Sequence, residues 1–263
     1  MKGLVFGNSH VAALYMARGK QSGLALDFYA ISGGAGPSIT VQDGRIYPAD
    51  SKMTVQGTIA DAVSDGLGLT GYDYVLFASL GLAAVRAEFG HIYRQYVLAG
   101  LGQPQEDTAG LLSQALAEQV ALASLRRQPG VKALKQLAEL YKGPIYCAPR
   151  PLPVRACIGL DHPLAQIYGD NLEAFLRWCG GVQMRTNRMI VQELRPGVVA
   201  LDVPDLAWIE AGGTPRSYVV GGDPWHKNIE HDPWHMNAEY GGCVLQQLQQ
   251  ALFQSGLNEE TDK

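Results

Sequence analysis

Short apolar runs recur along the chain, separated by longer segments in which apolar residues are spaced as on one face of a helix. Apolar runs of this length, without polar alternation, are typical of strands buried on both faces of a sheet. We predict five such strands, at residues 2–7, 24–31, 72–79, 143–148 and 198–203.

The intervening segments carry apolar residues three and four positions apart, which indicates helices that cover a sheet. Thr108 is a candidate N-cap for one of them. Residues 39–58 lack this spacing and are predicted to be irregular, with a small hairpin around Asp43 and Gly44. We predict helices at residues 10–20, 84–98, 108–127, 130–141, 164–180, 182–194 and 237–253.

This alternation of strands and helices predicts an α/β fold with a mainly parallel sheet. Neither a repeat across the whole chain nor a linker divides the sequence, so we predict one domain over residues 1–263. Ligands of such sheets bind beyond the carboxyl ends of the strands. The segments that follow the strands are therefore expected to converge at one edge, namely Ser9, Gly33 and Gly34, residues 79–82 and residues 149–153.

Composition and charge narrow the classes of partner. The net charge is −4 without a basic cluster, which argues against nucleic acid. No apolar run reaches the roughly 18 residues of a membrane span, and the first run is too short for a signal peptide. The four cysteines form no CxxC pair. We expect a cytoplasmic protein whose cysteines are reduced, at positions 147, 157, 179 and 243.

Candidate chemistry begins at Gly7-Asn8-Ser9-His10, where the first predicted strand gives way to the first helix. Backbone N–H groups and the dipole at a helix N-terminus favour a developing negative charge. A hydroxyl placed there suits a nucleophile. Ser9 is therefore a candidate nucleophile, and the alternative is that it serves as the helix N-cap. The two roles are compatible.

A local duplication near the C-terminus supplies a candidate base. The motif DPWHxN occurs twice, with Asp223 and His226 in the first copy and Asp232 and His235 in the second. An aspartate three residues before a histidine can hold the imidazole in one tautomer and stabilise its charged form. The second copy leads directly into the last predicted helix, which favours His235 over His226. The structural alternative is a turn aspartate before proline and a histidine at a helix start.

These motifs resemble those of the SGNH (GDSL-type) hydrolase family. Gly7-Asn8-Ser9 matches its first block, with Asn in place of Asp, and Asp232 with His235 matches its last block. The resemblance implies a flavodoxin-like three-layer α/β/α domain with about five parallel strands. It also implies that Ser9 is the nucleophile, His235 its base and Asp232 the orienting acid. The backbone N–H groups of Ser9 and of Gly33 or Gly34 would then form the oxyanion hole.

The third family block departs from the pattern. The family has Gly-x-Asn-Asp after the third strand, and its asparagine donates to the oxyanion. The corresponding segment here reads SLGLAA over residues 79–84 and contains no asparagine. One oxyanion donor is therefore absent or comes from elsewhere, and the loss of one such donor costs about 100- to 1000-fold in turnover. The resemblance does not extend to the helical middle of the chain.

Three further residues are candidates for substrate binding. His10 stands beside the candidate nucleophile, where it either lines the pocket or is a surface residue of the first helical turn. Arg150 lies between two prolines at a strand end, where it either binds an anionic group of the substrate or forms a surface salt bridge. Trp234 either stacks on a sugar, lines an acyl pocket or serves only in packing.

A metal-dependent enzyme is an alternative, because three histidines and two aspartates occur between residues 223 and 235. Prolines interrupt the segment, so these residues do not have the spacing of ligands on one helix face. We expect neither a metal nor another cofactor.

The sequence therefore predicts a serine esterase or O-deacetylase that acts on a small-molecule or carbohydrate ester. An acyltransferase with the same site and a non-catalytic binding protein of this fold are the alternatives. The pattern leaves the acyl group and the oligomeric state open.

Overall fold

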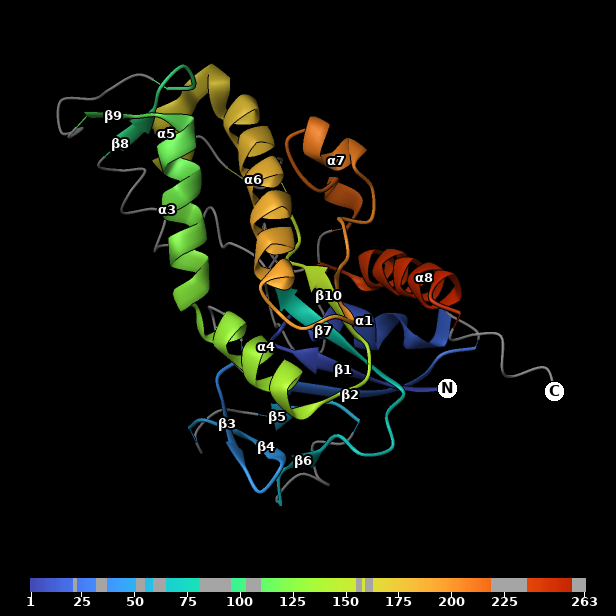
Figure 1. Cartoon of the computed structure of the whole chain (residues 1–263). Coiled ribbons are helices and arrows are strands. Elements are labelled where there is room, and N and C mark those ends of the chain that lie inside the picture. The colour runs from blue at the N-terminus through green and yellow to red at the C-terminus, as the bar shows by residue number, and fades with distance from the viewer. Residues whose placement is uncertain are drawn as a thin grey trace.

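The computed structural model describes residues 1–20, 23–31, 37–50, 55–58, 65–80, 96–102, 110–154, 158, 163–218 and 236–256. At its centre is a six-stranded sheet in the order β11-β10-β7-β1-β2-β5 (Figure 1). The strands are β1 (Lys2–Gly7), β2 (Ala25–Ile31), β5 (Val55–Gln56), β7 (Tyr74–Leu80), β10 (Ile145–Pro149) and β11 (Val198–Ala200).

Five of these strands are parallel, and the short β5 pairs antiparallel with β2 at one edge. Counted along the chain, the parallel strands have the spatial order 2-1-3-4-5, since β2 lies on one side of β1 and β7 on the other. In doubly wound sheets of this order, ligands bind beyond the carboxyl ends of the strands where the winding reverses. That point lies here between β1 and β7.

Successive residues of the central strands face opposite sides of the sheet, as the pleat requires. In β1, Leu4 and Phe6 belong to one buried cluster and Val5 to the other. Helices cover both faces, so the chain forms the three layers of an α/β/α fold, as predicted. One layer contains α3 (Gln114–Arg127), α4 (Pro129–Leu140) and α6 (Leu172–Gln192), and the other contains α1 (Val11–Ala17) and α8 (Ala238–Gln254).

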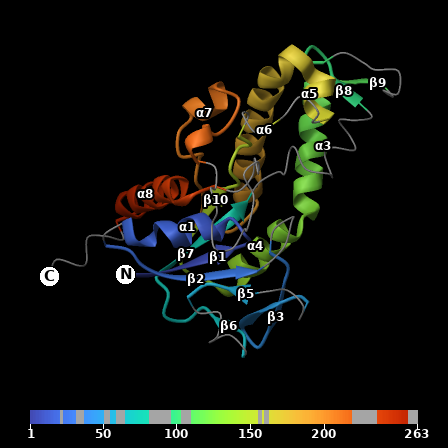
Figure 2. The same ribbon diagram turned by 180° about the vertical axis from the view of Figure 1, so that it is seen from behind.

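Helices α1 and α8 lie side by side on one face, although they come from opposite ends of the chain (Figure 2). Gly241 makes this approach possible, because a Cβ atom there would lie 2.0 Å from the carbonyl oxygen of Ala13. The start of α8 is fixed by Asn237, whose Oδ1 accepts the N–H groups of Glu239 and Tyr240 at 3.0 and 3.2 Å.

Smaller elements extend the domain. The expected hairpin is present as β3 (Ile39–Gln42) and β4 (Arg45–Pro48), with Asp43 and Gly44 both at positive φ. The strand β6 (Leu67–Gly68) completes that sheet. The remaining elements are β8 (Tyr96–Leu98) paired with β9 (Gly110–Leu112), α5 (Pro163–Tyr168), α7 (Ala207–Glu210) and 3₁₀ turns at Arg18–Lys20, Gly169–Asn171 and Arg216–Tyr218.

Four of the predicted helices need correction. The helices predicted at 164–180 and 182–194 do not break between Gly180 and Gly181, since α6 runs through both. Gly180 packs there against Leu152 and Ile209, with Cβ-to-side-chain distances of only 3.3–3.4 Å if a Cβ were present. Tertiary packing thus outweighs the intrinsic cost of glycine in a helix.

The helix predicted at 108–127 begins only at Gln114, because Gly110–Leu112 pairs as strand β9. Its N-cap is Ser113, whose Oγ accepts the N–H of Leu116 at 3.2 Å, whereas Thr108 lies outside the described residues. Tyr96–Leu98, predicted as the end of a helix, is strand β8, and residues 81–95 are not described. Among the described helices, none combines the length and apolar character needed to cross a membrane.

Candidate functional site

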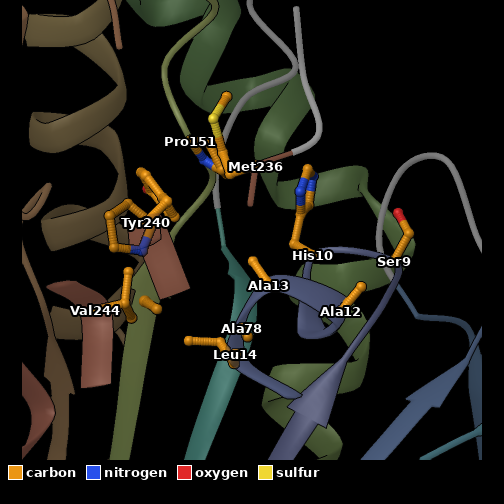
Figure 3. Close-up of a pocket in the computed structure, with 12 residues that line it drawn as sticks. Ser9, His10, Ala12, Ala13, Leu14, Ala78, Pro151, Met236, Tyr240 and Val244 are labelled. Carbon is orange, nitrogen blue, oxygen red and sulfur yellow. The ribbon is translucent and has the colours of Figure 1, made fainter. Parts of the chain in front are cut away.

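The turn after β1 is held tightly by its own backbone and by Asn8. Gly7 is required where β1 meets β7, because a Cβ there would lie 2.1 Å from the carbonyl oxygen of Ala78. Asn8 is fully buried, and its Oδ1 accepts the N–H of His10 at 3.2 Å. This turn fixes the backbone from which Ser9 and His10 project beyond the carboxyl end of β1 (Figure 3).

The same hydrogen bonds limit what the start of α1 can offer an anion. The N-cap of α1 is His10 rather than Ser9, and the helix is only seven residues long. The N–H groups of Val11 and Ala12 donate to the carbonyls of Asn8 and Ser9, at 2.9 and 3.1 Å. Together with the bond from His10, three successive amides are used inside the turn. The helix N-terminus therefore contributes less to anion binding than the sequence suggested.

Ser9 and His10 lie in the wall of a pocket on the face of the sheet that α1 and α8 cover (Figure 3). Most of its wall is apolar and made of small side chains. Besides Ser9 and His10, the lining residues are Ala12, Ala13, Leu14, Ala78, Ala148, Pro149, Pro151, Met236, Tyr240 and Val244.

One side of the pocket is contributed by the start of α8. Met236 is buried there and directly follows His235 in the chain. The backbone N–H of Asn237 donates to the carbonyl of Tyr218, at 2.8 Å, and this bond anchors the segment that leads into α8. Tyr240 lies one turn further on, packed against Trp208, and burial raises the pKa of its hydroxyl above the ordinary range. Among the described residues, that hydroxyl has no hydrogen-bond partner.

Arg150 approaches the pocket from the carboxyl end of β10. Arg150 is only 6% exposed, so it does not lie on the surface. The Nε atom of Arg150 donates to Nε2 of His10 at 3.1 Å. The carbonyl oxygen of Arg150 accepts the side-chain amide of Gln183 on α6, at 2.6 Å, and Pro149 and Pro151 on either side both line the pocket. Arg150 is therefore held at both its backbone and its side chain.

The contact with Arg150 determines the proton position on His10. A guanidinium has donors only, so the Nε2 atom that faces it accepts and carries no proton. The imidazole is then neutral, with its proton on Nδ1. Because its Nε2 lone pair is engaged, His10 is poorly suited to remove a proton from Ser9 through that nitrogen.

Two buried thiols are poorly suited to act as nucleophiles. Cys147 and Cys179 are buried, and desolvation raises the pKa of each thiol far above its ordinary value. A thiol that stays protonated is a weak nucleophile. Among the described residues there is also no cluster of three or more histidine, cysteine, aspartate or glutamate side chains arranged to hold a metal.

Of the residues predicted for the site, Ser9 and His10 line one pocket, and Arg150 contacts His10 beside it. Gly33, Gly34, His226, Asp232, Trp234 and His235 lie outside the described residues. The sequence analysis did not foresee Met236 or the alanines Ala78 and Ala148 in the wall. Their positions, at the carboxyl ends of β7 and β10 and just before the last helix, are the signal from which they could have been predicted.

Comparisons with protein-family models, with curated proteins and with solved structures give no significant match for this chain.

Proposed function

We propose that the protein is a serine hydrolase that cleaves a short-chain carboxylic ester, with Ser9 as the nucleophile. One observation carries the proposal. Ser9 lies where the parallel sheet reverses its winding, in a pocket whose opposite wall begins at the residue after His235. This is the position at which α/β sheets of this order bind their ligands.

The choice of base follows from the contacts of His10. Its Nε2 already accepts a hydrogen bond from Arg150, which argues against His10 as the base. Met236 lines the pocket, and a peptide bond keeps neighbouring Cα atoms about 3.8 Å apart. Because His235 is the residue before Met236 in the sequence, we propose His235 as the base and Asp232 as its orienting acid. This supports the second DPWHxN copy over the first.

In the proposed reaction, His235 takes the proton of the Ser9 hydroxyl as Oγ attacks the ester carbonyl carbon. The carbonyl electron pair moves onto oxygen, where the N–H groups of Ser9 and of Gly33 or Gly34 are the proposed donors. Collapse of this intermediate expels the alcohol, which receives its proton from His235. Water, activated by the same histidine, then releases the acid from Ser9.

The pocket wall supports a short acyl group. Ala78, Ala148 and Ala13 leave room beside Ser9, and Leu14 and Val244 make the surface apolar. A methyl or ethyl group gains about 0.8 kcal/mol per buried CH₂ in such surroundings, whereas a long chain meets the packed α1–α8 contact. We propose an acetyl or propionyl ester, for example an O-acetyl group on a carbohydrate.

A fluorophosphonate probe tests the nucleophile directly. The wild-type protein should be labelled at Ser9, as located by mass spectrometry of the digest, and Ser9→Ala should not be labelled. Ser113→Ala is a matched control because that serine caps α3 and does not line the pocket, so it should be labelled like the wild type. Absence of labelling in the folded wild-type protein would overturn the proposal and leave a binding protein of this fold.

A series of p-nitrophenyl esters from acetate to octanoate tests the acyl group and the base. Turnover should be highest for acetate or propionate and should fall steeply from butyrate onward. His235→Ala should abolish turnover, while His226→Ala should retain most of it. Activity that survives in His235→Ala but not in His226→Ala would assign the base to the first copy of the motif instead.

A further inference from the structure

The oxyanion formed at Ser9 needs more donors than the backbone of the first turn supplies. The amides of His10, Val11 and Ala12 are all used within the turn. The segment after β7, at residues 79–84, contains no asparagine side chain. Among the described residues, a side chain in the pocket wall is therefore a further source of a donor near Ser9, beside the N–H groups proposed above.

His10 has the position and the rigidity for this role. It lines the pocket next to Ser9, and both side chains extend beyond the end of β1 (Figure 3). Its backbone is fixed by Asn8, and its ring is fixed through Nε2 by Arg150. A donor that is already oriented costs no reorganisation when charge develops, which is how such donors lower a barrier.

Arg150 determines which nitrogen of His10 carries the proton. Because the guanidinium can only donate, it keeps Nε2 unprotonated and leaves Nδ1–H as the donor of the ring. Arg150 is itself locked by Gln183 on α6 and is only 6% exposed. Its positive charge, screened little by solvent, also favours negative charge in the pocket.

We propose that the Nδ1–H of neutral His10 donates a hydrogen bond to the substrate oxygen that becomes negative when Ser9 attacks. His10 thereby takes the place of the missing asparagine, and Arg150 is the positioning residue that holds its tautomer. The proton stays on His10 throughout, so it acts by hydrogen bonding and not by proton transfer. This inference rests on the proposed hydrolase function.

Kinetics of two His10 variants separate a donor from a packing residue. His10→Phe keeps a planar ring without a donor and should lower kcat for p-nitrophenyl acetate about 100- to 1000-fold, with little change in KM. His10→Gln keeps an N–H donor and should retain activity within about tenfold of the wild type. The urea midpoints of both variants establish that the folded state is retained, and His10→Gln serves if His10→Phe does not fold.

The tautomer provides a readout that does not depend on activity. In ¹⁵N-histidine-labelled protein, the His10 signals, identified by their loss in His10→Gln, should show a protonated Nδ1 and an unprotonated Nε2. Arg150→Met should move the proton partly or wholly to Nε2 and lower kcat more than it raises KM. Arg177→Met is the matched control, because that arginine pairs with Glu173 on the surface of α6 and should change neither.

The outcomes distinguish the inference from the function on which it rests. If His10→Phe reacts with the fluorophosphonate at the wild-type rate and keeps its turnover, the inference is overturned while Ser9 remains the nucleophile. A wild-type Nε2–H signal, or a larger loss in Tyr240→Phe than in His10→Phe, also overturns it. If the folded wild-type protein is not labelled at Ser9, the hydrolase function itself fails, whatever the tautomer of His10.

Discussion

Charged residues have different roles at the two ends of the parallel strands, called here the amino edge and the carboxyl edge of the sheet. At the amino edge, Lys2 pairs with Asp27 at 2.8 Å, and the hydroxyl of Tyr72 donates to the same carboxylate, also at 2.8 Å. The backbone N–H of Lys2 bonds the side chain of Asp73, which ties the start of β1 to the start of β7. At the carboxyl edge, the buried cation Arg150 faces a neutral imidazole and a pocket.

Two arginines make the contrast concrete. Arg195 donates to the backbone carbonyls of Ala138, Tyr141 and Gly143, and so secures the connection from α4 into β10. Arg150 sits at the other end of the same strand and donates to a side chain that lines a pocket. All of these Arg195 donors bond backbone carbonyls and so stabilise the fold. Arg150 instead places a buried charge beside a side chain of the pocket wall. We therefore expect variants at the amino edge to alter stability and variants at the carboxyl edge to alter activity.

The largest effect is expected for Ser9→Ala. Turnover of p-nitrophenyl acetate should fall about 10⁴-fold or more, because the proposed nucleophile is removed. The free energy of unfolding in urea should change by less than about 0.5 kcal/mol, since only a half-buried hydroxyl is lost. Residual turnover within about tenfold of the wild type would contradict the expectation that variants at the carboxyl edge alter activity.

Gly241→Ala should weaken the fold and disturb the pocket together, because α8 contributes to both. The added Cβ would lie 2.0 Å from the carbonyl oxygen of Ala13 and force α8 away from α1. We expect a loss of about 3 kcal/mol in the free energy of unfolding, measured in urea.

Gly242→Ala is the matched control for this helix contact. A Cβ there meets no atom of the described part of the chain within 4 Å. Alanine in a helix interior should therefore stabilise the protein by about 0.5–1 kcal/mol. Equal effects of the two substitutions would show that the α1–α8 contact is not the cause.

Arg195→Met tests whether variants at the amino edge alter stability and leave activity unchanged. It removes the donors for three backbone carbonyls and should lower the free energy of unfolding by about 2 kcal/mol. The kcat of the remaining folded protein should equal that of the wild type, measured at a temperature well below its Tm. A selective loss of kcat, with unchanged stability, would contradict the division between the two edges.

The smallest effect is expected at a pair that belongs to neither edge. Arg185 on α6 donates to both carboxylate oxygens of Glu118 on α3, each at 2.8 Å, and this bond lowers the pKa of Glu118 below 4.5. A lowered folded-state pKa stabilises the protein above the unfolded-state value, and the contribution is lost as the pH falls through the folded-state value.

Glu118→Gln should therefore cost less than about 1 kcal/mol at pH 7. The difference from the wild type should shrink as the pH falls from 7 to 3, measured by urea unfolding at each pH. A difference that grows toward acid pH would mean that the pair does not lower this pKa.

The central architecture was predictable because each core strand is buried on both faces and reads as a continuous apolar run. The order of the strands, and with it the place of Ser9 at the reversal of the winding, follows from contacts that no local pattern contains. The glycine pair in α6 shows the limit of local reasoning, because Gly180 is tolerated through its packing on Leu152 and Ile209.

For the site, the sequence indicated Ser9, His10 and Arg150 separately, from the ends of predicted strands. It did not indicate that Arg150 and His10, which are 140 residues apart, form one hydrogen bond. That bond depends on the register of β10 beside β7 and of β7 beside β1. The proton position on His10, which decides its chemistry, is therefore a property of the folded sheet.

The approach of α8 to α1 has a consequence for the way the protein is made. The pocket wall combines residues 9–14 with residues 236–244, so no ribosome-bound chain can complete it before α8 has emerged. Until then, the apolar face of α1, with Val11 and Leu14, lacks its cover and is a target for chaperones or aggregation. A chain released before α8 is made would therefore lack one wall of the pocket.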